Sequence, residues 1–216
     1  MVTMFCGVAI NGIYSISYKI PSLITAISGI FTSAWQISAV EDFGSKESIK
    51  FFSRIYCRYS ALFILLTSIV IFFIKFIADI LFSKAFYDAW KYASILIIAS
   101  MFQSLCSFLG SIYTTAMKTR MIFVTTMLGA MSNIAFNLLL IPSCGAYGAA
   151  IATLMSYMIV WIVRLLNSRK IIKLQIQVKK DIICYLIIGI QCFYMIMGKS
   201  YVYIVNTICL IILLFV

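Results

Sequence analysis

The sequence predicts an all-α fold, a polytopic membrane helix bundle of about seven transmembrane helices. The chain of 216 residues is 64% hydrophobic and only 11% charged, with a mean hydropathy of +1.10. A soluble domain is about 25% charged. The charged residues are gathered into short stretches between long uncharged runs, and one membrane crossing needs about 20 apolar residues. A soluble core of this size could not bury so much apolar surface, so lipid must solvate much of it.

Run length and helix breakers place the spans, because a helix that is apolar on all sides has no informative periodicity. The predicted spans are 13–40, 57–79, 89–117, 120–141, 145–167, 182–198 and 200–216. The uncharged run Met121–Val163 is long enough for two spans. Pro142 lacks an N–H and disfavours helix at Ile141, whereas Ser143 and Gly145 suit a turn.

Small residues open the helix that follows this turn: Gly148, Ala149, Ala150 and Ala152. Small side chains let helices approach closely in a membrane. We therefore expect the two halves of this run to form an antiparallel, closely packed hairpin.

The distribution of basic residues decides what the net charge of +11 means. In a nucleic-acid-binding protein the positive charges would lie on one face, whereas in a membrane protein they would lie in alternate loops. The connections 41–58, 118–120 and 164–181 hold 12 of the 17 basic residues. The opposite side holds Lys75, Lys84, Lys91 and Lys199. The charge follows topology, so we predict no nucleic-acid partner, cytoplasmic basic loops, an N-terminus outside and a C-terminus inside.

Catalysis is not predicted. The chain has no His, and its seven Cys have no zinc-type or disulfide-framework spacing. All six acidic residues fall in or near predicted loops, so no mid-membrane carboxylate is expected to relay protons. We therefore predict no enzyme activity, no cofactor and no metal site.

Four segments, in order, resemble one protein family. "GIYSISYKIP" (12–21), "FTSAWQISAVED" (31–42), "FYDAWKYASILIIASMFQSLCSFLGSIYTTAMKT" (86–119) and "IPSCGAYGAAIATLMSY" (141–157) are similar to segments of Wzx-type O-antigen and capsule flippases. These belong to the multidrug/oligosaccharidyl-lipid/polysaccharide exporter superfamily. The resemblance implies a MATE-like arrangement of fourteen helices, with two lobes of six and an extra pair.

The matched region would run from just before the eighth family helix towards the end. Residues 1–167 would then form a five-helix bundle resembling the C-terminal lobe, and 168–216 would supply additional, truncated helices. We expect no signal peptide in the first twelve residues, and we interpret both ends as cuts through a larger membrane protein.

The resemblance implies transport. The intact protein would flip an undecaprenyl-diphosphate-linked oligosaccharide across the bacterial plasma membrane for O-antigen or capsule synthesis, by alternating access around a cationic cavity. Partners would be this lipid-linked oligosaccharide, membrane lipids, and polysaccharide polymerase or glycosyltransferases. Two alternatives stay open: a drug or small-solute antiporter of the same superfamily, and a non-transporting, truncated membrane subunit.

Five polar side chains are candidate substrate contacts: Lys19, Gln36, Gln103, Asn133 and Asn137. Lys19 is expected about two turns inside the first helix, where it would face the cavity and hold a diphosphate, or snorkel to the headgroups.

The remaining candidates would bind sugar hydroxyls or bond to neighbouring helices. Gln103 belongs to a polar stripe with Ser107 and Ser111, and Gln36 stands beside Trp35, an interfacial-anchor candidate. Four residues are predicted to act in bending or packing: Pro21, Pro142, Gly145 and Gly148.

Overall fold

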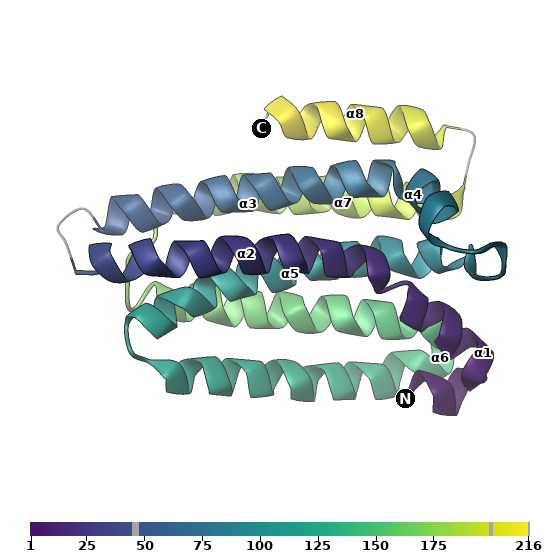
Figure 1. Cartoon of the computed structure of the whole chain (residues 1–216), viewed down its shortest axis with the longest axis horizontal. Helices are drawn as coiled ribbons and strands as arrows, with labels where there is room; N and C mark the ends of the chain where they lie inside the picture. Colours follow the sequence, from purple (N-terminus) through teal and green to yellow (C-terminus); the bar gives the residue numbers. More distant parts are fainter. Residues whose placement is uncertain (45–47, 199–200, 216) are drawn as a thin grey trace.

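The computed structural model describes residues 1–44, 48–198 and 201–215, and these residues form an all-α bundle (Figure 1). Five of its helices are long and apolar enough to cross a membrane, and one of them is a double-length hairpin. The fold class predicted from composition and run length is therefore confirmed. The elements, in order, are α1 (Val2–Ile16), α2 (Lys19–Asp42), α3 (Ser48–Phe72), α4 (Ile74–Leu81), η1 (Lys84–Phe86), α5 (Ala89–Thr115), α6 (Thr119–Ser168), α7 (Val178–Met197) and α8 (Val202–Phe215).

Helix α5 is the centre of the bundle. It packs against α2, α3, α6 and α7, and 89% of its most apolar 18-residue stretch is buried. Small residues such as Ala93, Ala99 and Gly110 let these neighbours approach it, and Phe108 and Tyr113 fill the space between them. A helix enclosed in this way positions the elements on every side of it.

The first predicted span is broken in the structure. Helix α1 ends at Ile16 and α2 begins at Lys19, so the span expected over 13–40 belongs to two helices. A proline ring clashes with the carbonyl four residues earlier, which for Pro21 is Ser17 at the break. Pro21 itself lies in the first turn of α2, where its missing N–H costs no helical bond.

The position of Lys19 changes with this break. Lys19 is the first residue of α2 and is exposed, so the expectation that it lies two turns inside a helix was wrong.

The second predicted span also differs from the structure. Helix α3 begins at Ser48 rather than at 57, and it ends at Phe72, where the short helix α4 follows. Lys50, Arg54 and Arg58 suggested a loop, but their spacing of four puts all three on one exposed helix face. The opposite face buries apolar side chains such as Phe52 and Tyr56, which continues the helix into the predicted loop.

Helix α6 is the predicted hairpin. Its two halves lie side by side (Figure 1) and join at Gly145, whose φ of 57° and ψ of −137° are not helical. The first half continues through Pro142 beyond the helix end predicted at Ile141, and the chain turns at Gly145, four residues after Ile141. Pro142 is exposed.

Close packing between the halves is shown at Gly148. A Cβ there would lie 2.2 Å from the carbonyl oxygen of Leu140 and 2.9 Å from the nitrogen of Ile141.

The connections predicted to be cytoplasmic lie together. The ends of α2, α5 and α6, and the helix starts that follow them, are at the left in Figure 1, whereas α4, η1 and the α6 turn are at the right. The basic residues of the connections 41–58, 118–120 and 164–181 therefore gather at one end of the bundle. Two of the counted lysines lie outside the described residues: Lys46 on this side and Lys199 on the opposite side. Which end faces the cytoplasm stays a prediction.

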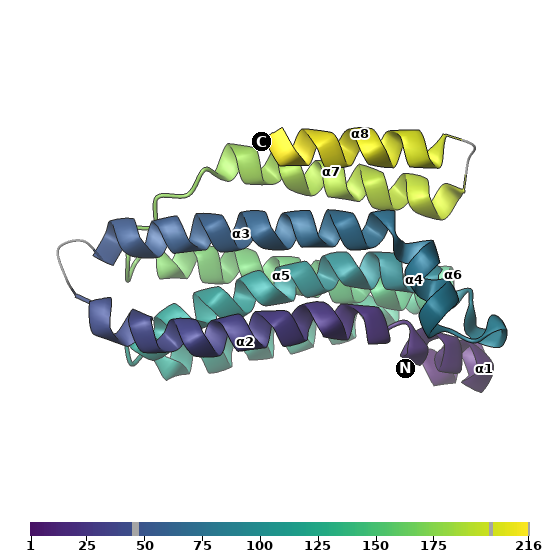
Figure 2. The same ribbon diagram turned by 45° about the horizontal axis from the view of Figure 1, so that its top comes forward.

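Helices α7 and α8 pack on the α3 side of the bundle (Figures 1 and 2). Ser68 Oγ donates to Gln191 Oε1 at 2.7 Å, and Gln191 Nε2 donates to the Ser68 carbonyl at 3.0 Å. Both residues are buried, so this reciprocal pair fixes α7 against α3.

Candidate binding cavity

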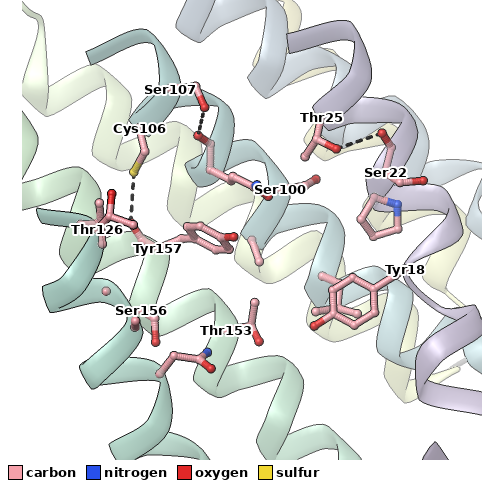
Figure 3. A pocket seen from close by; sticks show the side chains of 18 of the residues that line it. Tyr18, Ser22, Thr25, Ser100, Cys106, Ser107, Thr126, Thr153, Ser156 and Tyr157 are labelled. Carbon is pink, nitrogen blue, oxygen red and sulfur yellow. Dashed lines mark hydrogen bonds between the residues drawn. The ribbon is translucent and has the colours of Figure 1, made fainter. Parts of the chain in front are cut away.

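A cavity of about 640 Å³ lies between α2, α5 and both halves of α6 (Figure 3). Every one of these elements contributes polar side chains to its wall. They are Tyr18, Ser22, Thr25, Ser100, Gln103, Ser107, Thr126, Asn133, Thr153, Ser156, Tyr157 and Arg164. A wall of this kind is unusual in a membrane bundle, where polar side chains cost free energy unless they have partners.

Several wall hydroxyls donate to a backbone carbonyl one turn earlier in their own helix. Ser107 donates to the Gln103 carbonyl at 3.1 Å, Thr153 to the Ala149 carbonyl at 2.9 Å, and Ser156 to the Ala152 carbonyl at 2.6 Å. Because the hydroxyl proton is used in this way, each oxygen keeps lone pairs that can accept a hydrogen bond from a ligand.

Arg164 is the one charged residue among the described residues that line the cavity. It is 7% exposed. Its guanidinium donates from Nε to Thr125 Oγ1 at 3.0 Å, from Nη1 to the Cys106 carbonyl at 2.7 Å, and from Nη2 to Thr126 Oγ1 at 3.0 Å. Arg164 thereby ties α5 to both halves of α6.

These three bonds neutralise no charge, because all three acceptors are uncharged. No described carboxylate lies within 4.0 Å of the Arg164 guanidinium. Three of its five N–H groups are used, so two remain available to an anion. A bidentate arginine suits a carboxylate or a phosphate.

The sequence analysis counted Arg164 with the basic connection 164–181, although the predicted span 145–167 also includes it. Helix α6 continues to Ser168, which puts Arg164 one turn before the helix end and inside the bundle. The residue was missed because Arg169 and Lys170 follow it closely, so it looked like the first member of a basic loop.

The predicted contact residues are partly brought together. Gln103 and Asn133 line the cavity, as does Pro21. Gln36 lines a smaller neighbouring cavity of about 270 Å³, which shares Thr25, Gln103 and Ser107 with the larger one.

Two predicted contacts line neither polar cavity. Lys19 lies outside the wall of the larger one, although Tyr18 and Pro21 are part of that wall. Asn137 is 8% exposed, and its Nδ2 donates to Asn133 Oδ1 at 2.8 Å, so it positions Asn133.

Trp35 and Ser111 are used in packing. The Trp35 Nε1 donates to Ser111 Oγ at 3.0 Å, and its ring stacks on Phe108 with centroids 5.2 Å apart. Trp35 is buried rather than at an interface, and Ser111 leaves the polar stripe that was predicted with Gln103 and Ser107.

A periodic signal for the missed wall residues was present in the sequence. Thr153, Ser156, Tyr157, Val160 and Arg164 follow the i, i+3, i+4, i+7, i+11 spacing of one helix face. All five line the cavity, so this face could have been recognised as polar before the structure was known.

Comparison with known proteins supports the interpretation that the chain is a membrane protein. The chain is 32% identical over 126 residues to the uncharacterized membrane protein MJ1068 of Methanocaldococcus jannaschii. The match covers 56% of this chain and 24% of the relative, so the chain spans about a quarter of that protein's length. No family model and no solved structure matches the chain. With the apolar helices, this similarity supports a multi-pass membrane protein of uncharacterized type.

Proposed function

We propose that this chain forms one wall of a membrane transporter that flips an undecaprenyl-diphosphate-linked oligosaccharide across a bacterial plasma membrane. The observation that carries the proposal is the buried Arg164, which faces a cavity of about 640 Å³ and has no described carboxylate beside it. A charge buried in a membrane bundle is costly, and such residues usually mark a substrate path.

The chemistry of the wall fits both parts of such a substrate. The free N–H groups of Arg164 suit a diphosphate, and the hydroxyl and amide groups of Gln103, Asn133, Thr153 and Ser156 suit sugar hydroxyls. The wall contains no carboxylate among its described residues, so the expected ligand is an anion rather than a cationic drug.

The polar surface continues along the bundle. The larger cavity and the smaller one beside Gln36 share three residues, so polar groups follow α2 and α5 over several turns. A face of this kind suits an aqueous path or a second lobe better than lipid. The resemblance to two-lobed flippases supports a second lobe, which would form the opposite wall and move against this one.

Binding to the purified chain tests the proposal. A fluorescent undecaprenyl-diphosphate-linked oligosaccharide is titrated into the chain in detergent, beside an uncharged lipid-linked sugar. Arg164→Gln should weaken binding of the diphosphate lipid about tenfold to a hundredfold, since a bond to a charged group contributes about 1.5–3 kcal/mol. Arg164→Lys should retain part of the affinity because it retains the charge.

Arg58→Gln is the matched control, because Arg58 is exposed on α3 and lines neither polar cavity. Equal affinity for the charged and uncharged lipids, or equal loss in Arg164→Gln and Arg58→Gln, would contradict the proposal.

A further inference from the structure

A second and chemically different groove lies on the other face of the second half of α6. Its volume is about 540 Å³, and its walls come from α5, α6 and α7. It shares no lining residue with the polar cavity. Apolar side chains make up nearly the whole wall, including Ile98, Phe102, Leu154, Met158 and Leu186.

The groove opens to an exposed apolar surface of the bundle. Ile162, Leu166, Ile182 and Leu186 line it and are 43%, 56%, 47% and 63% exposed. Its floor is rigid, because Phe102, Trp161 and Tyr185 pack edge to face or tilted against one another with centroids 5.0–5.5 Å apart. An apolar channel of this size, open along its length, suits an acyl chain.

A positive charge stands at one end of this groove. Arg169 is the one charged residue among the described residues that line it. It is exposed just beyond the end of α6. That end of α6 lies at the same end of the bundle as the other basic connections (Figure 1). The segment 170–180 adds four exposed lysines: Lys170, Lys173, Lys179 and Lys180. Asp181, in the first turn of α7, is the single acid beside them.

The basic segment is held in place. The Gln175 backbone N–H donates to Ser53 Oγ at 2.9 Å, and Ile172 and Leu174 are buried on either side of the exposed Lys173. The lysines are therefore presented on an anchored connection, close in sequence to both helices that wall the groove.

From this arrangement we propose that the groove binds an anionic glycerophospholipid, with an acyl chain in the apolar channel and the phosphate at Arg169. Charge complementarity selects this ligand, because an uncharged chain would leave Arg169 unused and a free phosphate would leave the channel empty. Basic pockets between transmembrane helices bind anionic headgroups in this way. The lipid would fill the space between α6 and α7.

Native mass spectrometry tests the proposal with the full chain in detergent and equal amounts of phosphatidylglycerol and phosphatidylcholine. The chain should retain phosphatidylglycerol preferentially. Arg169→Gln should reduce this preference about fivefold, because one basic residue near an anionic headgroup contributes on that scale. Arg169→Lys should preserve it, and the exposed Arg58→Gln should leave it unchanged.

A second variant tests the channel. No atom lies within 4 Å of a Cβ built on Gly189, a residue that lines the groove, so the first atom of a side chain added there meets open space, and Gly189→Leu should occupy part of the channel. It should reduce retention of both lipids while the thermal stability of the chain is kept. Equal retention of the two lipids by the unmodified chain, full retention in Gly189→Leu, or full displacement by inorganic phosphate would overturn the proposal. These results are independent of substrate binding at Arg164, because the two sites share no residue.

Discussion

Replacing Gly148 by alanine should force the two halves of α6 apart. The new Cβ would lie 2.2 Å from the Leu140 carbonyl oxygen, 2.5 Å from the Leu140 carbonyl carbon and 2.9 Å from the Ile141 nitrogen. All three atoms belong to the backbone, so no side chain can rotate to relieve the contact. Overpacking costs about 1–3 kcal/mol in general. We expect about 3 kcal/mol here, because a whole helix must shift by roughly 1 Å to restore an ordinary contact.

The same substitution elsewhere provides the control. Gly189→Ala meets open space on α7, and alanine exceeds glycine in helix propensity by about 1 kcal/mol, so this variant should be as stable as the unmodified chain or more so. Leu139→Ala should also have little effect, because Leu139 is 70% exposed. The free energy of unfolding is measured by denaturant titration in detergent, with tryptophan fluorescence as the signal. Equal stability of Gly148→Ala and Gly189→Ala would refute close packing at the hairpin.

Three further outcomes are expected. With Cys144 as the only cysteine, a membrane-impermeant thiol reagent should label it from outside the cell; labelling only from the cytoplasmic side would reverse the topology. Gln191→Leu should lower the free energy of unfolding by about 1 kcal/mol. Adding Ser68→Ala to this variant should lower it little further, because the two side chains bond to each other. Fully additive losses would mean that the pair is not coupled. Expressed alone in a strain without its own flippase, the chain should insert but not restore surface polysaccharide; restoration would show that one copy or a homodimer is sufficient.

Features that rest on single residues were predictable from the sequence. The α6 turn has Pro142 and Gly145 within four residues. Gly145 combines a positive φ with a non-helical ψ, a backbone conformation that residues with a Cβ rarely adopt. The small residues from Gly148 onward indicated close packing, and the clash distances show it at Gly148.

Features that depend on distant partners were not predictable in the same way. The break at Ser17 and Tyr18 carries no glycine, and its cause lies one turn later, at Pro21. Arg164 resembles its neighbour Arg169 in sequence, and only its bonds to Thr125 and Thr126, almost 40 residues earlier, distinguish a buried cation from an exposed one. The polar cavity is assembled from three helices, so no single stretch of sequence contains it.

The arrangement of α5 and α6 has a consequence for how the protein is made. The ribosome completes α5 before either half of α6 exists, so the polar face of α5, with Ser100 and Gln103, first enters the membrane without its cover. The α6 turn has no charged residue, and its two halves are locked at Gly148, so they can leave the translocation machinery as one folded unit. A single cotranslational event would then cover α5 and complete the cavity around Arg164. Substitutions that loosen the hairpin would therefore expose the polar face of α5 to lipid and to membrane quality-control proteases during synthesis.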